Sequence, residues 1–407
     1  QVRRDEVREQ MNRVIIDLEA LHENIQVVDK WMTEHNATWT LVTKVLCGHA
    51  DTLKGLQTVG VRSMGDSRLA NLRSIERIVP DLEAWYLRLP HLAALEDIVT
   101  LADVSLNSEV DTIEAINEEA RRQGKVHRSI IMIELGDLRE GILPGSLIKF
   151  YNHIFELSNI EVLGIGANLG CLSGAVPNVD QLTQLSLYKE LLELKFERKL
   201  PMISAGSSAV LPLLLQDKVP KHINHFRIGE AIFLGTDLVY GGKLPGLRDD
   251  AITVEADIVE IKEKSLLPLG ETTSMTPFES FQPEAGGENV PPGQRGYRAV
   301  ITLGQLDTDV QGLTPKDPEH QIAGASSDLT VVNIGEEAGG LKVGDTIKFS
   351  PNYAALVRAM SGKYIEKFVV PSVARFADTV PDENKDLLPP VLEQVSALEE
   401  GKSSGES

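Results

Sequence analysis

The sequence has little that would cross-link the chain or anchor it in a membrane. Only two of the 407 residues are cysteines, Cys47 and Cys171, and two thiols make neither a disulfide framework nor a metal-binding spacing. No apolar run approaches the length that crosses a bilayer, and no apolar block follows the charged first ten residues. We therefore expect no membrane partner and no secretory signal, and the scarcity of cysteine favours a cytoplasmic protein.

Basic residues are also in short supply. The 60 Asp and Glu residues outnumber the 40 Lys and Arg residues, which leaves a formal net charge of -20. Because nucleic acids and anionic membranes are bound through basic patches, we expect the protein to bind neither. Its nine histidines show no ligand spacing, so we expect no metal site. Part of the negative charge lies in residues 371–407, an acidic tail that we expect to be disordered.

What the sequence does contain is a long alternation of two patterns. Between residues 12 and 230, eight short apolar runs alternate with amphipathic helical stretches such as residues 111–122 and 144–157. Alternating strands and helices imply parallel strands, because each return to the same edge of a sheet needs a crossover. We predict an α/β fold with a TIM-like (β/α)8 barrel over residues 12–244, and a doubly wound open sheet as the alternative. The apolar runs are residues 39–45, 59–64, 85–89, 103–106, 130–135, 162–166, 202–205 and 224–228.

The pattern changes after about residue 245, where helical periodicity fades. We expect a separate antiparallel β domain over residues 245–370, to which residues 12–18 contribute a further strand. A stretch rich in Pro, Gly and Glu, residues 278–295, is expected to be an exposed loop. The β-rich runs are residues 251–261, 297–303, 329–334 and 345–349.

Polar and charged residues follow the ends of the predicted barrel strands. In a (β/α)8 barrel these ends surround one pocket, so the residues just beyond them come together. Arginines, a lysine and a serine pair form an anion-binding set in an otherwise acidic chain, and a phosphorylated ligand would explain this set. The positions are Lys44, Ser67, Arg68, Arg88, Asn107, Arg139, Asn168, Ser207, Ser208, Arg227 and Gly229.

Lys44 is the nucleophile candidate of this set, in the string LVTKVLCGH of residues 41–49. A lysine at a strand end is partly desolvated and close to other cations, and both effects favour the neutral amine that attacks an aldehyde. An equally weighted alternative is a lysine that extends from the barrel mouth into solvent.

Several strings, in order from about residue 12 to residue 370, resemble one family. IIDLEAL (15–21), VTK (42–44) and GH (48–49) resemble the opening of alanine racemases, which are fold type III pyridoxal-phosphate enzymes. Further strings are similar to the alanine/ornithine racemase branch of that family. These strings are GDSRLAN (65–71), LNSE (106–109), GDLREG (136–141), GIGANLGC (164–171), RIGEA (227–231) and ASSD (325–328).

The resemblance implies a barrel and a β domain that work as a head-to-tail homodimer with shared active sites and pyridoxal 5'-phosphate as the cofactor. Lys44 matches the lysine that holds the cofactor as a Schiff base and transfers a proton on one face. Arg139 matches an arginine near the phenolic oxygen of the cofactor, and Asn168 matches a residue stacked against its ring. The positions that match contacts to the phosphate are Ser207, Ser208, Gly229, Glu230 and Tyr364.

Arg227 corresponds to the arginine that faces the pyridine nitrogen of the cofactor. An arginine keeps its proton at any relevant pH, so the ring nitrogen must accept a hydrogen bond and stay unprotonated. The ring is then a weaker electron sink, which suits an enzyme that only removes and returns a proton. The alternative for Arg227 is a structural ion pair.

The second proton-transfer residue is where the sequence departs from the family. Alanine racemases use a tyrosine from the partner's β domain, in a Gly-Tyr-x-Asp-Gly setting, whereas the matching residues 303–307 read LGQLD. Ser327 and Asp328 fall where the family brings the partner's loop to the substrate, so they are the candidates. A turn in which Asp328 caps a backbone amide is an equally weighted alternative.

These matches predict an isomerase, an amino-acid racemase that interconverts L and D enantiomers by removing and returning the α-proton. The alternatives are a D-amino-acid aldolase or dehydratase, a decarboxylase, or a weakly catalytic pyridoxal-phosphate-binding protein of cofactor homeostasis. The substrate is left open among alanine, ornithine, lysine and other amino acids. Glu134 or Asp137 is a candidate partner for a cationic substrate side chain, and each is equally plausible as a structural carboxylate.

Overall fold

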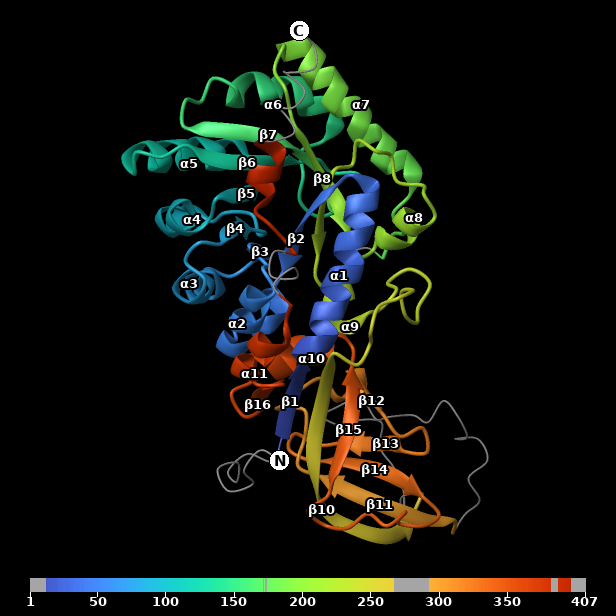
Figure 1. Ribbon diagram of the computed structural model, residues 1–407. Coiled ribbons are helices and arrows are strands. Elements are labelled where there is room, and N and C mark those ends of the chain that lie inside the picture. Colours follow the sequence, from blue (N-terminus) through green and yellow to red (C-terminus); the bar gives the residue numbers. More distant parts are fainter. Residues whose placement is uncertain (1–11, 171, 173, 267–292, 382–386, 397–407) are drawn as a thin grey trace. The chain divides into compact units, whose positions relative to one another are not determined.

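The computed structural model describes residues 12–170, 172, 174–266, 293–381 and 387–396. Eight parallel strands close into a barrel in which the last strand, β9, pairs with the first, β2 (Figure 1). Each of the eight predicted apolar runs supplies one strand, so the (β/α)8 prediction is confirmed and the open sheet is excluded. The barrel strands are β2 (Thr38–Val42), β3 (Ser63–Asp66), β4 (Glu83–Tyr86), β5 (Val104–Asn107), β6 (His127–Met132), β7 (Ile160–Gly166), β8 (Met202–Ser207) and β9 (His225–Ile228).

Amphipathic helices connect these strands. In α5 (Val110–Arg122), Ile113, Ile116 and Ala120 are buried at helical spacing, and the helix carries Asp111 in its first turn and Arg122 in its last. This arrangement buries one apolar face and matches charge to the helix dipole at both ends. The other helices of the barrel unit are α1 (Leu18–His35), α2 (Ala50–Thr58), α3 (Leu69–Ile78), α4 (Leu95–Leu101), α6 (Leu147–Ile154), α7 (Val179–Phe196), α8 (Leu211–Leu215), α9 (Glu230–Leu234) and α11 (Val373–Thr379), with 3-10 turns η2 (Leu92–Ala94) and η3 (Pro144–Ser146). A further 3-10 turn, η1 (Lys44–Leu46), follows β2.

Gly164 marks a close approach between β7 and β8. It pairs with Met202, and a Cβ at Gly164 would lie 1.9 Å from the Met202 carbonyl oxygen. The obstructing atom belongs to a paired backbone, so a side chain at this position can be admitted only by separating the two strands.

Gly164→Ala is therefore expected to lower the free energy of unfolding by about 3 kcal/mol, the upper part of the range for overpacked cores. Urea unfolding measures this loss. Gly145→Ala is the matched control, because nothing lies within 4 Å of a Cβ at Gly145. Equal midpoints for the two variants would contradict the prediction.

An antiparallel sheet forms the second unit, with strand order β12-β15-β10-β11-β14-β13. β1 (Asn12–Asp17) pairs antiparallel with β10 and parallel with β16, so the early strand joins this sheet. The predicted loop at residues 278–295 lies outside the described residues except for its last three positions. The strands are β10 (Ile252–Ser265), β11 (Arg295–Ile301), β12 (Leu313–Pro315), β13 (Gln321–Ala325), β14 (Thr330–Gly335), β15 (Thr346–Pro351) and β16 (Glu366–Val370), with η4 (Val310–Gly312) and helix α10 (Tyr353–Ser361) between them.

The two compact units do not follow one cut in the sequence. The β unit contains the described residues within Gln1–Asp17, Val45–Cys47 and Asp250–Pro371. The barrel unit contains those within Leu18–Lys44, Gly48–Asp249 and Ser372–Ser407. Among the described residues, no helix combines the length and the apolar character that a membrane span requires.

The expectation of a disordered tail from residue 371 is wrong for two segments of the barrel unit. Phe376, in α11, is 2% exposed. Residues 391–396 form a short helix whose Val391 is fully buried with Trp85 and Met202 in the barrel core. Leu388, just before this helix, is 1% exposed, and its carbonyl accepts a hydrogen bond from the amide of Arg62. The acidic composition of the tail concealed these three apolar side chains, whose burial orders the two segments.

Candidate active site

Lys44 lies at the mouth of the barrel, directly beyond β2, and β9 is the neighbouring strand. A Cβ at Gly229 would lie 2.9 Å from the Val42 carbonyl oxygen, so glycine lets the two strand ends approach. Burial raises the pKa of the Glu230 carboxyl, while a hydrogen bond from Thr236 and the positive charge of Lys44 oppose this rise. The positive charge of Lys44 therefore acts on the Glu230 carboxyl, and both groups lie at the C-terminal ends of the barrel strands.

The serine pair lies on the other side of β9, at the end of β8. The Ser208 hydroxyl accepts a hydrogen bond of 3.2 Å from the amide of Ala231, which joins the β8 end to the start of α9. The Ser207 hydroxyl is buried and has no hydrogen-bond partner within the described part of the chain. A buried hydroxyl without a partner is costly, and a phosphate oxygen is the kind of acceptor that would satisfy it. The residues present thus fit a phosphorylated ligand.

Arg227, on β9, is a buried cation that is 7% exposed. Its guanidinium donates to the carbonyls of Ser204, at 2.6 Å, and of Ala167, at 3.0 Å. It also donates to the Ser204 hydroxyl and, at 2.9 Å, to the Asn168 side-chain oxygen. Acceptors on β8 and just beyond the end of β7 thus fix the direction of this guanidinium at the barrel mouth.

Asn168 links Arg227 to a second arginine. Its side-chain amide donates to the Glu140 carboxylate, which also accepts from the guanidinium of Arg139. Arg139 lies 3.8 Å from an oxygen of Asp137 as well. The structure therefore brings together Arg227, Asn168 and Arg139, and it adds Glu140, which the sequence had shown only as part of a motif.

Glu134 and Asp137, the two candidate partners for a cationic substrate side chain, accept hydrogen bonds from backbone amides. One oxygen of Glu134 accepts hydrogen bonds from the amides of Gly136, at 2.7 Å, and Leu138, at 2.9 Å. Asp137 is 3% exposed, and it accepts a hydrogen bond of 3.0 Å from the amide of Leu172. Both side chains order the loop after β6.

Ser327 and Asp328 belong to the β unit, where they form the exposed tip of the β13–β14 hairpin. The Ser326 hydroxyl, rather than Asp328, caps the turn by accepting from the amides of Asp328 and Leu329. The Leu306 amide donates to the Ser327 carbonyl at 2.9 Å. The hairpin tip and the tyrosine-free stretch 303–307 are thus held side by side.

Tyr364 is also in the β unit, and its side chain is 56% exposed. The ammonium of Lys363 lies over its ring, 4.9 Å from the centroid. The assignment of Tyr364 to the phosphate therefore stays a prediction.

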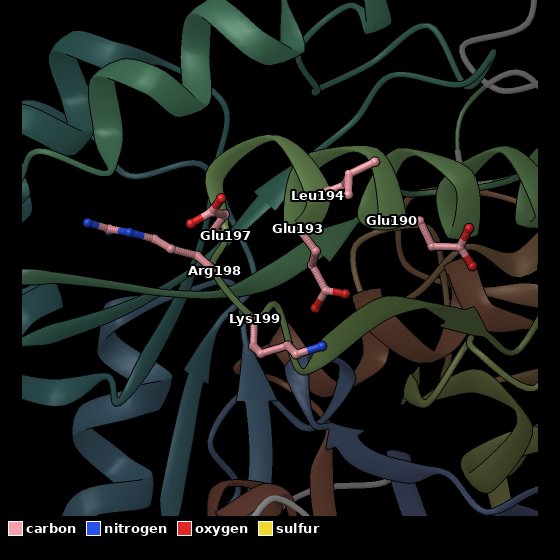
Figure 2. A pocket seen from close by; sticks show the side chains of 6 residues that line it. All are labelled: Glu190, Glu193, Leu194, Glu197, Arg198 and Lys199. Carbon is pink, nitrogen blue, oxygen red and sulfur yellow. The ribbon is translucent and has the colours of Figure 1, made fainter.

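A surface hollow lies elsewhere, at the C-terminal end of α7 (Figure 2). This helix end leads into the start of β8, so the hollow faces the N-terminal ends of the strands, away from Lys44 and Arg227. A Glu193 oxygen already accepts from the Leu200 amide, at 2.7 Å, and from Lys189, at 3.0 Å. The hollow is therefore no part of the site. Its lining residues are Glu190, Glu193, Leu194, Glu197, Arg198 and Lys199.

A closed parallel barrel whose mouth gathers a lysine, a buried arginine and a serine pair defines an enzyme that holds a phosphorylated cofactor. Residues 16–237 match the family model described as "Alanine racemase, N-terminal domain". The chain is 36% identical to an ornithine racemase from Acetoanaerobium sticklandii over 358 residues, which are 87% of this chain and 98% of that one. It is 31% identical to a lysine racemase from Thermotoga maritima over 363 residues, 89% and 99% of the two chains.

The fold is shared with solved structures. An alanine racemase from Bartonella henselae with covalently bound pyridoxal phosphate superposes with a TM-score of 0.65 at 17% identity, covering 88% of this chain and 99% of that one. The protein belongs to the alanine racemase family. It is an amino-acid racemase, and its cofactor is pyridoxal phosphate.

Proposed function

We propose that this racemase acts on a basic diamino acid of the ornithine or lysine type, taking it between its L and D forms. The observation that carries the proposal is that relatives with 36% and 31% identity along nearly their whole length are an ornithine racemase and a lysine racemase. The partly buried carboxylate of Glu230 beside Lys44 supports it, because a distal ammonium group of the substrate needs a fixed negative partner.

The family resemblance, together with the positions of the site residues at the barrel mouth, supports a role for each of them. When bound, pyridoxal phosphate supplies an aldehyde for the substrate amine and a conjugated ring that acidifies the α-proton. The amine of Lys44 would hold the cofactor and carry a proton on one face. Asn168 would lie against the ring, Arg227 would donate to the ring nitrogen, and Arg139 would donate to the phenolic oxygen. The phosphate would be held by the hydroxyls of Ser207 and Ser208 and by the backbone of Gly229 and Glu230.

The second proton would come from a partner subunit. A homodimer with shared sites would bring the exposed hairpin tip, with Ser327 and Asp328, to the barrel mouth of the other protomer. The carboxylate of Asp328 is the better proton carrier of the two, because a carboxylate releases and takes up a proton far more readily than a hydroxyl. The acidic, cysteine-poor composition supports a cytoplasmic location.

A chiral chromatography screen tests the substrate proposal. With the twenty L-amino acids and L-ornithine as substrates, kcat/KM for ornithine or lysine is expected to exceed that for alanine by about 100-fold or more, because a site built for a distal ammonium leaves buried polar groups unpaired with alanine. Glu230→Gln is expected to reduce this preference and to leave the alanine rate nearly unchanged. Equal or faster racemisation of alanine by the unaltered protein would contradict the proposal.

A further inference from the structure

A continuous chain of hydrogen bonds runs from Arg227 into the interior of the barrel. The Arg227 guanidinium donates to the Ser204 hydroxyl, which lies 2.7 Å from Nδ1 of His225. Nε2 of His225 lies 3.0 Å from the Thr40 hydroxyl, and this hydroxyl lies 3.0 Å from that of Ser63. Ser204, His225, Thr40 and Ser63 are all fully buried, so protein groups alone supply these links.

The chain ends on Glu83, at the start of β4 and so near the opposite end of the barrel from Lys44. Ser63 donates to Glu83 at 3.0 Å, and the indole of Trp85 donates to the same oxygen at 2.6 Å. The other oxygen accepts the amide of Leu392, at 2.7 Å. Glu83 thereby joins the chain to the C-terminal helix of residues 391–396, the short red helix beside the barrel strands in Figure 1.

The charged groups at the two ends of the chain, Arg227 and Glu83, give every hydrogen bond between them the same donor-to-acceptor direction. Burial, reinforced by the charge of Arg227, lowers the pKa of His225 well below its usual value, so its ring is neutral and carries one N–H. Arg227 can only donate, and the Glu83 carboxylate can only accept. Each hydroxyl in between therefore accepts from the arginine side and donates toward Glu83, which puts the His225 proton on Nε2.

Two packing features hold the middle of this chain in place. The His225 ring stacks on the Trp85 ring, with centroids 4.5 Å apart and planes 17° from parallel. Burial raises the pKa of the Glu83 carboxyl, whereas the hydrogen bonds from Trp85, Leu392 and Ser63 oppose this rise and stabilise the carboxylate. Trp85 thus fixes both the imidazole and the carboxylate.

We propose that Glu83 and the C-terminal helix are remote positioning elements of the active site, which hold Arg227 toward the cofactor through the chain Ser204–His225–Thr40–Ser63. The negative end of the chain orients Ser204 so that its lone pair, rather than its proton, faces the guanidinium. A break anywhere along the chain frees Ser204 to reorient and loosens the arginine. The proposal rests on the role proposed for Arg227, and it is independent of which amino acid is racemised.

Thr40→Val breaks the chain, Glu83→Gln removes the negative charge at its end, and both variants leave every residue at the barrel mouth unchanged. Valine has the shape of threonine without its hydroxyl. Glutamine presents an amide group either to Leu392 or to Ser63 and Trp85, and these donors then lose their acceptor. Each variant is expected to raise the Kd for pyridoxal phosphate about three- to tenfold, the size of typical couplings within one hydrogen-bond network, and to shift the visible absorption of the bound cofactor.

The double variant Thr40→Val/Glu83→Gln shows whether the two substitutions act on Arg227 through one hydrogen-bond chain or through two independent local effects. Once the chain is broken at Thr40, the charge of Glu83 no longer reaches Ser204, so the double variant should show the Kd of one single variant and not the product of both effects. Val395→Ala is the matched control. It trims the C-terminal helix without touching the chain, so it should lower stability and leave the Kd within about twofold.

Multiplicative effects on the Kd, or an unchanged Kd despite lower stability, would overturn the proposal. Arg227→Lys tests the underlying role separately. An unchanged Kd and spectrum in Arg227→Lys would show that the role of Arg227 itself is wrong. A raised Kd there, with unaffected chain variants, would show that the relay alone is wrong.

Discussion

Lys44→Ala is expected to lower the rate of racemisation by at least about 1000-fold, since the role proposed for this amine is both to bind the cofactor and to move a proton. The variant is also expected to lose pyridoxal phosphate on dialysis, because the contacts proposed for Ser208, Gly229 and Arg227 are noncovalent. Chiral chromatography measures the rate, and the visible absorbance after dialysis measures the retained cofactor.

Two substitutions sharpen this test. Lys44→Arg keeps the positive charge beside Glu230 but provides no neutral amine, so it should be as inactive as Lys44→Ala. Lys54→Ala removes a side chain on α2 that is 52% exposed and paired with Asp51, and it should retain full activity. Retention of the cofactor together with activity within tenfold of the unaltered protein in Lys44→Ala would refute the assignment.

The barrel could be predicted because its strands are locally encoded. Each strand is a short apolar run set between helical stretches, and the requirement for a crossover helix makes the strands parallel. Three strands of the β unit were not predicted, namely β12, β13 and β16. They pair at the edge of the sheet or in short ladders, and they lack a long apolar run. The strand at residues 12–18 was predicted from its short apolar run, and burial alternates along β1 in the structure.

The residues of the candidate site at the strand ends could be predicted from the sequence. The buried residues that hold them in place could not. Lys44, Arg227 and Ser208 lie at or just beyond the ends of apolar runs, so their positions could be derived from the barrel rule. His225 and Ser204 face the barrel interior, and they meet only because β8 and β9 are adjacent in register. A histidine two residues before an arginine gives no sign of such a contact in the sequence.

Removal of residues 387–407 is expected to destabilise the barrel unit by about 4–6 kcal/mol. Leu388, Val391 and Val395 are between 0% and 8% exposed, and burial of such a side chain contributes about 1.5–3 kcal/mol, less the burial already present in the unfolded chain. The truncation also takes the amide of Leu392 from Glu83, which leaves a buried carboxylate oxygen short of a donor.

Urea unfolding followed by tryptophan fluorescence measures this loss in the barrel unit alone. All three tryptophans, Trp31, Trp39 and Trp85, belong to that unit, so the β unit does not contribute to the signal. A chain that ends at Ser396 is the control, since it keeps the buried helix and removes only the last eleven positions. If both chains unfolded at the same urea concentration, the C-terminal helix would contribute nothing to the barrel. Because the same helix also closes the hydrogen-bond chain to Arg227, the shorter chain should bind pyridoxal phosphate more weakly even in the absence of urea, where both chains are folded.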